Sequence, residues 1–545
     1  MGNRLDETKQ DLKVEPDSRS VDEMNAAGGI DTVDDSCGSS SGSSFEPSSE
    51  SSCESSSGSS SGPSEVAAAA QVKPATTESA DAQKQASGAP TVRRRRRALD
   101  LAGHTIEQNL WILAGPLIAE RLLQSTVDAA DMAMVGRVGA AAVAAVGLSN
   151  QISMIATGFF DAIRVGTTSV IARRVGAGRL DEAQKTLRQS LLIAACLGFI
   201  SFLMFSVYSA ASLRMMGAEP DVIAMGVRYF FWKGLSLCFE YVTMTFAAGL
   251  RGSGHTDLPM YVGIVMNLLN LCGNYVLING HYGFPKLEAE GAGLSTAFAR
   301  FVGMLLIMYL MSNKHNPLKG WFRGSFKPDT EALGRVLQIG LPASGERLTL
   351  RGAQILYTRA IAGLGTNAYA AHQIALRIES ISLTIGFSFG AATTTLVGQY
   401  LGFGDKQKAE LAARKAQKIA SLAMGCAGVL LFLAAPSVVH LFIPDNPVVA
   451  EMGATVLRIV AVAQPFMAIN HVLAGGLRGA GDTKWVMYIT GGSAWAVRVA
   501  LTYLFVKTFG LGLPGAWYAM VTDLIARSMM FRWRFGTGHW KHIRV

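Results

Sequence analysis

The eight residues Gly115–Leu122 read GPLIAERL, and the eight residues Leu341–Leu348, 226 positions later, read LPASGERL. Residues 167–178 return as residues 393–404 at the same shift, and the loop Gly249–Gly254 (GLRGSG) returns as GLRGAG after 227 positions. Chance matches would not keep one register over so long a stretch. The chain therefore contains an internal duplication, and its two halves should share one fold.

Each half consists of apolar stretches of about 18–30 residues, which is long enough to cross a hydrocarbon core of about 30 Å. Backbone groups in lipid must be satisfied internally, so these stretches should be helices. We expect an all-α integral membrane protein with twelve transmembrane helices in two six-helix lobes. Six spans return the chain to the same side, so the lobes should be related by an axis along the membrane normal. The spans are predicted to start near Ile106, Ala141, Gln189, Val222, Leu258, Gly291, Leu333, Asn367, Ala420, Val448, Trp485 and Gly515.

The composition agrees with a membrane protein, because only 16% of the 545 residues are charged, against about 25% in soluble domains. The net charge of +9 divides into −10 for residues 1–92 and +19 for residues 93–545. We predict a disordered, Ser/Gly-rich acidic tail at 1–98, an N-terminal lobe at 104–312 and a linker at 313–332. A C-terminal lobe at 333–535 and a short tail at 536–545 should follow.

Basic residues gather in alternate joints, at 173–188, 314–327 and 406–418. The positive-inside rule then places these joints, the linker and both termini in the cytoplasm, with the spans in the cell membrane. Cations distributed in this way argue against a nucleic-acid partner. The chain has no Gly-Lys-[Ser/Thr] phosphate loop and no CxxC pair, so we expect no use of ATP, no metal site, no cofactor and no enzymatic activity. The predicted partners are the bilayer and small organic substrates, and the predicted state is a monomer.

The duplicated loops, in this order, resemble the multidrug and toxic compound extrusion (MATE) family over residues 104–535. The matching segments are Val127–Gly139, Gly249–Thr256, Ala370–Ala375, Leu396–Gly402 and Leu477–Thr483. The resemblance implies a secondary antiporter in which inward flow of protons or sodium drives export of amphipathic, often cationic, compounds. It also implies two lobes that rock about a central cleft.

Ionisable residues inside a span are costly in lipid, so they are functional candidates. In the first span, four polar residues fall within an arc of about 80° on one helical face. Their equivalents in the second half keep only the glutamate, which confines the predicted carboxylate cluster to the N-terminal lobe. The four residues are Glu120, Gln124, Asp128 and Asp131, and their equivalents are Glu346, Leu350, Gln354 and Tyr357.

By resemblance, Asp131 corresponds to the first-helix aspartate that binds the coupling ion in MATE proteins, with Asn270 and Thr296 near it. Asn274 stands where some members carry a second aspartate. A lone carboxylate with neutral neighbours favours a proton, with sodium as the alternative, and Asp128 belongs to the same predicted site.

Further candidates are Glu240 and Gln124, for substrate binding or coupling. Glu120 and Glu346 each follow a proline by four residues and precede an arginine. This symmetry favours a structural role, with substrate binding or coupling as the alternative. A flippase for a lipid-linked sugar or cell-wall precursor remains the second hypothesis, and it would favour a strongly cationic cleft.

Overall fold

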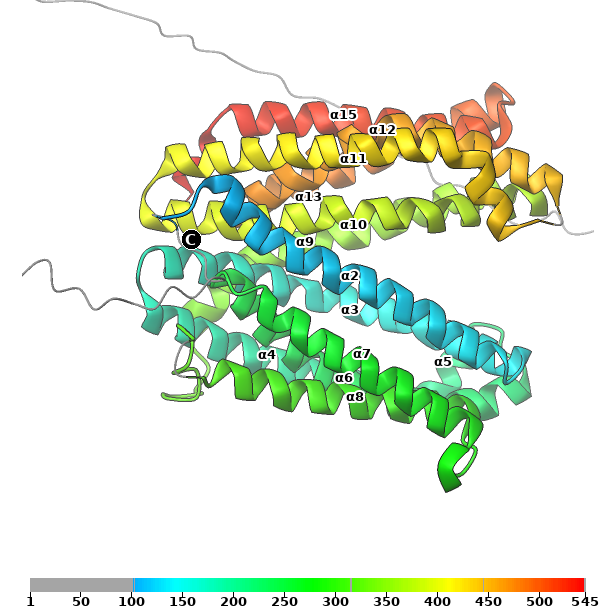
Figure 1. Cartoon of the computed structure of the whole chain (residues 1–545), viewed down its shortest axis with the longest axis horizontal. Helices are drawn as coiled ribbons and strands as arrows, with labels where there is room; N and C mark the ends of the chain where they lie inside the picture. The colour runs from blue at the N-terminus through cyan, green and yellow to red at the C-terminus, as the bar shows by residue number, and fades with distance from the viewer. Residues whose placement is uncertain (1–100, 102, 314–315, 445, 544–545) are drawn as a thin grey trace, which may run out of the picture. The chain divides into compact units, whose positions relative to one another are not determined.

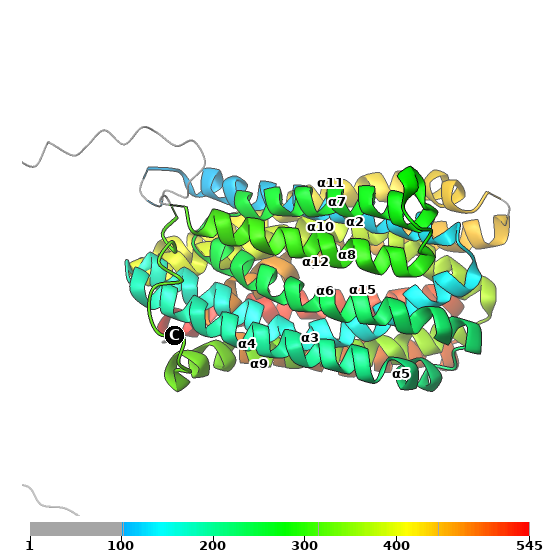
Figure 2. The same cartoon turned by 90° about the horizontal axis from the view of Figure 1, so that it is seen from below.

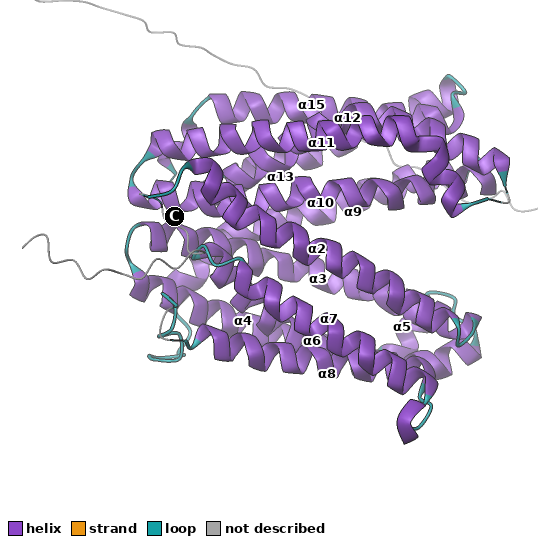
Figure 3. Ribbon diagram, viewed as in Figure 1, coloured by secondary structure: helices purple, strands orange, loops and turns teal. Residues whose placement is uncertain are grey.

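The computed structural model describes residues 101, 103–313, 316–444 and 446–543, which lie in one compact unit, Thr91–Val545. Within these ranges the ordered elements are helices and the structure contains no strand (Figure 3). The predicted tail at 1–98 lies outside the described residues. The first half contains α2 (Ile106–Gly136), α3 (Ala140–Gly176), α4 (Leu180–Val207), α5 (Ser209–Met215), α6 (Pro220–Gly252), α7 (Asp257–Asn279), η1 (His281–Gly283) and α8 (Glu288–Met311).

The second half repeats this order of helices (Figure 1). Its elements are α9 (Thr330–Ala362), α10 (Thr366–Phe403), α11 (Lys406–Phe442), α12 (Pro447–Ala480), α13 (Thr483–Ser493), η2 (Ala494–Val499), α14 (Ala500–Tyr503), η3 (Leu504–Thr508), α15 (Gly512–Gly536) and η4 (His539–His542). The segment Thr483–Thr508 forms one span, in which η2 and η3 are π-helical.

The prediction of an all-α membrane protein with two related halves is confirmed. Nine helices within the described residues are long and apolar enough to cross a membrane. The other three predicted spans correspond to α2, α9 and α15, with 31, 33 and 25 residues. These helices carry more charge because they take part in polar contacts between helices, as Glu346 and Arg347 of α9 do with Arg478 and Asp161.

Helix starts follow local sequence signals. Thr105 caps α2, because its side chain accepts a hydrogen bond from the backbone N–H of Gln108 at 3.3 Å, and the Gln108 side-chain oxygen accepts one from the backbone N–H of Thr105 at 3.0 Å. This reciprocal arrangement satisfies two backbone N–H groups that the start of a helix would otherwise leave without an acceptor. Pro220 and Pro447 open the equivalent helices α6 and α12, where the missing amide hydrogen is no loss.

Packing inside the first half places α6 against α3, α4 and α8, while α7 packs against α2 and α8 (Figure 2). The first helix of each half also packs against the other half. Leu110 and Leu113 of α2 are buried in the hydrophobic core of α10–α12. In the same way, Val336 and Ile339 of α9 are buried against Val170 of α3. The two halves are therefore joined through α2 and α9.

A reciprocal glycine contact of α3 with α10 brings the halves into close backbone approach. A β-carbon added to Gly176 would lie 2.1 Å from the carbonyl oxygen of Gln399, and one added to Gly402 would lie 2.1 Å from that of Arg173. Gly176 and Gly402 are equivalent in the duplication, as are Arg173 and Gln399. Only glycine allows the two backbones to pack at this distance.

We predict that Gly402→Ala destabilises the protein by about 1–3 kcal/mol, because the added methyl group meets a backbone carbonyl. Gly425→Ala is the matched control, since its β-carbon would lie 3.6 Å from Pro465, an ordinary contact. Removing glycine from a helix interior is otherwise stabilising by about 1 kcal/mol, so the two variants should differ in sign. Thermal unfolding in detergent measures both, and equal melting temperatures would contradict the interpretation.

Candidate functional site

Asp131 lies half-buried in α2 between polar side chains of α7 and α8. The amide nitrogen of Asn274 donates to Asp131 Oδ1 at 2.8 Å. Asn270, one turn earlier on α7, contacts Thr296 Oγ1 of α8 at 3.1 Å. In this arrangement the Thr296 hydroxyl donates to the carbonyl oxygen of Ala292 at 2.8 Å. The structure thus brings together the four residues that resemblance connects with ion coupling.

Asn270 fits this site in two orientations of its amide. With the nitrogen toward α2, it donates to Asp131 Oδ2 at 2.9 Å and Oδ1 at 3.2 Å, while its oxygen accepts from Thr296 Oγ1 at 3.1 Å. With the amide turned over, its nitrogen donates to Thr296 and its oxygen faces the carboxyl group. An ionised carboxylate only accepts hydrogen bonds, so it requires the first orientation.

The other polar residues of the first span separate into two groups. Gln124 Nε2 donates to Asp128 Oδ1 at 2.8 Å, and both side chains are exposed. Glu120 instead pairs with Arg251 of α6 at 2.7 Å. Its equivalent Glu346 pairs with Arg478 of α12 at the same distance. Because duplication preserved both ion pairs, these two glutamates hold the first and fourth spans of each lobe together.

Glu240 of α6 is also paired, with Arg300 of α8 at 2.6 Å, and Arg300 donates to Ser236 at 2.9 Å. Lys233 of α6 lies close enough to Glu240 and Asp131 to act on both electrostatically. Sequence reasoning missed Lys233 and Arg300. The signal was available, since each is a cation inside a predicted span.

The second half also holds buried carboxylates, outside the positions equivalent to the first-span cluster. Asp523 of α15 is fully buried and forms ion pairs with Arg498 at 2.9 Å and with Arg527 at 2.6 Å. Glu379 of α10 is buried nearby, within the electrostatic reach of Arg498. These residues do not occupy positions equivalent to Asp131, so comparison of the repeats alone did not reveal them. Arg498 lies in η2, a π-helical segment of the kind often found at functional sites.

Two equivalent arginines reach from one lobe to the other. Arg347 of α9 pairs with Asp161 of α3 at 2.7 Å, and Asp161 also pairs with Arg164 at 2.5 Å. Arg121 of α2, the equivalent of Arg347, lies over the ring of Phe387 at 5.4 Å. Phe387 is itself the equivalent of Asp161. The two halves therefore have equivalent contacts at this place, an ion pair between Arg347 and Asp161 and a cation–π contact between Arg121 and Phe387.

Spanning helices in two related lobes, with a polar site inside the first lobe, define a membrane transporter. The family model described as MatE matches residues 116–276 and 342–504, one match in each half. The chain belongs to the MATE family.

Similar proteins support this assignment. The probable multidrug resistance protein NorM of Thermotoga maritima is 30% identical and covers 80% of this chain and 93% of its own length. The multidrug resistance protein MdtK of Pectobacterium atrosepticum is 28% identical, with 78% and 94% covered. A solved MATE transporter of the MOP superfamily, in an outward-facing conformation, aligns with a TM-score of 0.74 at 24% identity, with 80% and 97% covered.

We predict that Asp161→Asn weakens the attachment between the lobes, because Arg347 loses its carboxylate partner. Arg347 is 48% exposed, so the expected loss is about 1 kcal/mol, which is a change of about fivefold in the ratio of joined to separated lobes. Spin labels on the equivalent exposed residues Asp181 and Gln407, in a cysteine-free background, report the distance between α4 and α11.

The variant should add a longer-distance population. Glu331→Gln is the matched control, because it removes an exposed ion pair with Arg335 inside α9. Identical distance distributions in Asp161→Asn and the control would contradict the role of this contact.

Proposed function

We propose that the protein is a multidrug antiporter that exports amphipathic, cationic organic compounds in exchange for inward protons. Membership of the MATE family and the names of its relatives support export of drugs. The observation that carries the coupling proposal is Asp131, a carboxyl group held between Asn270 and Asn274 inside a membrane span. A carboxyl group so placed can take up one proton outside and release it inside.

Asn270 provides a way for the site to respond to the proton. When Asp131 is ionised, Asn270 and Asn274 both donate to it. When Asp131 is protonated, its hydroxyl group can donate to the oxygen of the turned Asn270 amide, whose nitrogen then donates to Thr296. Both forms use the same heavy-atom positions, so the proton changes the direction of the hydrogen bonds with little cost in packing.

The cargo competes with the proton in this proposal. Asp128 is exposed one turn before Asp131 and keeps Gln124 as its partner. A cationic compound that approaches these two carboxylates favours their ionised forms, and it therefore promotes release of the proton from Asp131. Protonation on the outer side then favours release of the cargo.

Sodium is the alternative coupling ion. Asn274 Oδ1 is buried and has no hydrogen-bond partner among the described residues. Together with side-chain oxygens of Asp131, Thr296 and Asn270, Asn274 Oδ1 would give a cation site four oxygen ligands. Sodium prefers several hard oxygen ligands, so a test of coupling must include a sodium gradient.

A flippase for a lipid-linked precursor is the second candidate function. Arg121, Arg164 and Arg347 place three guanidinium groups near the interface of the lobes, with Asp161 as the carboxylate that pairs two of them. An anionic head group would favour that arrangement. For either function we propose a monomer in the plasma membrane. We also propose that both termini lie in the cytoplasm, because the basic joints should mark the cytoplasmic ends of the helices.

Transport in proteoliposomes tests the coupling proposal. We expect an inward proton gradient to drive countertransport of ethidium by the wild type, and Asp131→Asn to reduce this flux at least tenfold because the carboxyl group can no longer change charge. Asp181→Asn is the control, since Asp181 is exposed in the first turn of α4.

Binding of ethidium to Asp131→Asn should persist, which separates loss of coupling from loss of folding. Flux that survives in Asp131→Asn with an intact proton gradient would refute the coupling role. A flux that follows only a sodium gradient would replace the proton with sodium.

A further inference from the structure

A cavity of about 600 Å³ lies between the two halves, at the end of the helices that we assign to the cytoplasm. The first half contributes the end of α3 and the start of α4, and the second half contributes the start of α9, the turn between α12 and α13, and the chain end. The lining residues are Arg173, Arg179, Arg335, Gln338, Ile339, Gly481, Asp482, Lys484 and Ile543. Four of them are cations and one is a carboxylate.

The carboxylate does not neutralise these cations, because Asp482 already pairs with Arg534 at 2.8 Å. Arg173 donates to the carbonyl oxygen of Ala480 at 3.3 Å, a contact that leaves its charge uncompensated. Lys484 is exposed, and no ion pair with it occurs within the described ranges.

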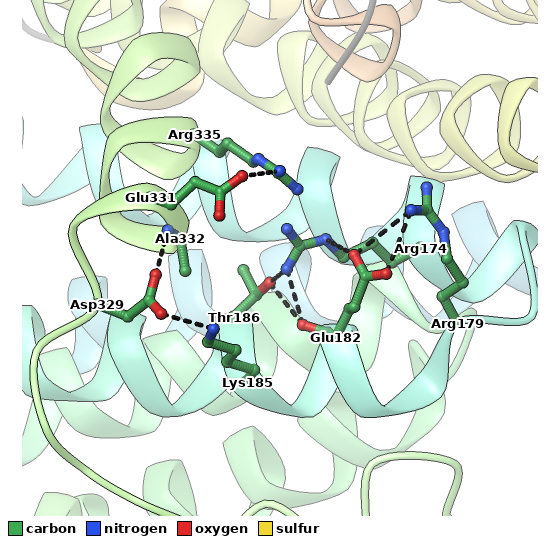
Figure 4. Close-up of polar contacts among 9 residues, drawn as sticks. All are labelled: Arg174, Arg179, Glu182, Lys185, Thr186, Asp329, Glu331, Ala332 and Arg335. Carbon is green, nitrogen blue, oxygen red and sulfur yellow. Dashed lines mark hydrogen bonds and ion pairs between the residues drawn. The ribbon is translucent and has the colours of Figure 1, made fainter.

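The other two cations each pair with a carboxylate (Figure 4). Arg179 pairs with Glu182 at 3.2 Å, but Arg174 contacts the same carboxylate at 3.4 Å. Arg335 pairs with Glu331, which is 74% exposed. The lining residues and their ion-pair partners together hold six cations and three carboxylates, a net charge of +3.

Asp329, a further carboxylate at the start of α9, does not alter this balance. Its side chain pairs with Lys185 at 2.5 Å, and the hydrogen bond from Lys185 holds the pKa of Asp329 below its usual range. The pair is neutral and lies beside the cavity.

The duplication shows that the fold does not need these cations. The positions equivalent to Arg173, Arg179, Arg335 and Lys484 carry Gln399, Asp405, Asn109 and Asp257. Membrane topology alone would place cations on the cytoplasmic side of both halves with equal ease. These four cations line the cavity, whereas the four equivalent positions of the duplication carry none. This difference points to a ligand in the cavity.

We propose that this cavity binds a phosphate group, carried by an anionic phospholipid or by a soluble phosphate compound. Guanidinium groups match the geometry and charge of phosphate oxygens, and basic pockets between helices on the cytoplasmic side suit phospholipid head groups. The ligand contacts residues of both halves, so it stabilises the arrangement in which α3 and α10 are in contact.

The test compares the purified wild type with the triple variant Arg173→Gln/Arg335→Asn/Lys484→Gln, whose first two substitutions copy the equivalent positions. The control is Lys319→Gln/Lys408→Gln/Lys418→Gln, which removes three cations elsewhere on the same side. Melting temperature in detergent is measured with phosphatidylglycerol, with phosphatidylethanolamine and with inorganic phosphate. Native mass spectrometry counts the retained lipid.

Phosphatidylglycerol should raise the melting temperature of the wild type and the control by about 2 °C or more, and the triple variant should lose this shift and the retained lipid. An equal shift with inorganic phosphate would support the site and assign it to a soluble ligand. If the triple variant does not fold, Lys484→Asp alone, which copies Asp257, should reduce the shift. The proposal is overturned if phosphatidylethanolamine acts as strongly, or if the shift survives in the variant that folds.

Discussion

The close contact of α3 with α10 is the constraint on which the rest of the structure depends. Gly176 and Gly402 bring two backbones together where any side chain would collide with a carbonyl oxygen. Around this contact the lobes add the pair of Arg347 with Asp161 and the bonds from Thr395 and Gln399 to the carbonyl groups of Arg251 and Gly252, at 3.0 and 2.9 Å. Rocking of the lobes must break these contacts, because each of them joins one half to the other.

The duplication separates what the fold needs from what the chemistry needs. Contacts kept in both halves, such as Glu120 with Arg251 and Glu346 with Arg478, hold each lobe together. Contacts that differ carry the proposed functions. Asp131 has the buried Tyr357 as its equivalent, whose hydroxyl group donates to the carbonyl oxygen of Ala516 at 3.3 Å. In the proposed mechanism, one half therefore supplies a carboxyl group that changes charge, while the other half has a backbone hydrogen bond at the same place.

Much of this fold could be predicted from the sequence, because length, apolar character and a repeated register each constrain it strongly. The grouping of Asp131 with Asn270, Asn274 and Thr296 was predicted from resemblance, and the structure shows the hydrogen bonds that connect these four side chains. The partners of Glu240 and Asp523 could not be predicted, since Arg300 and Arg498 lie on helices whose rotation depends on packing across the lobe. The packing of α2 and α9 against the opposite half also depends on tertiary contacts, which no local sequence pattern contains.

Proton release on cargo binding tests the central claim most directly. Addition of tetraphenylphosphonium to the purified protein in weakly buffered detergent, near neutral pH, should release protons from the wild type as a pH indicator reports. Asp131→Asn should bind the same cation and release none. Binding without proton release by the wild type, or equal release by the variant, would contradict the claim that Asp131 exchanges its proton for cargo.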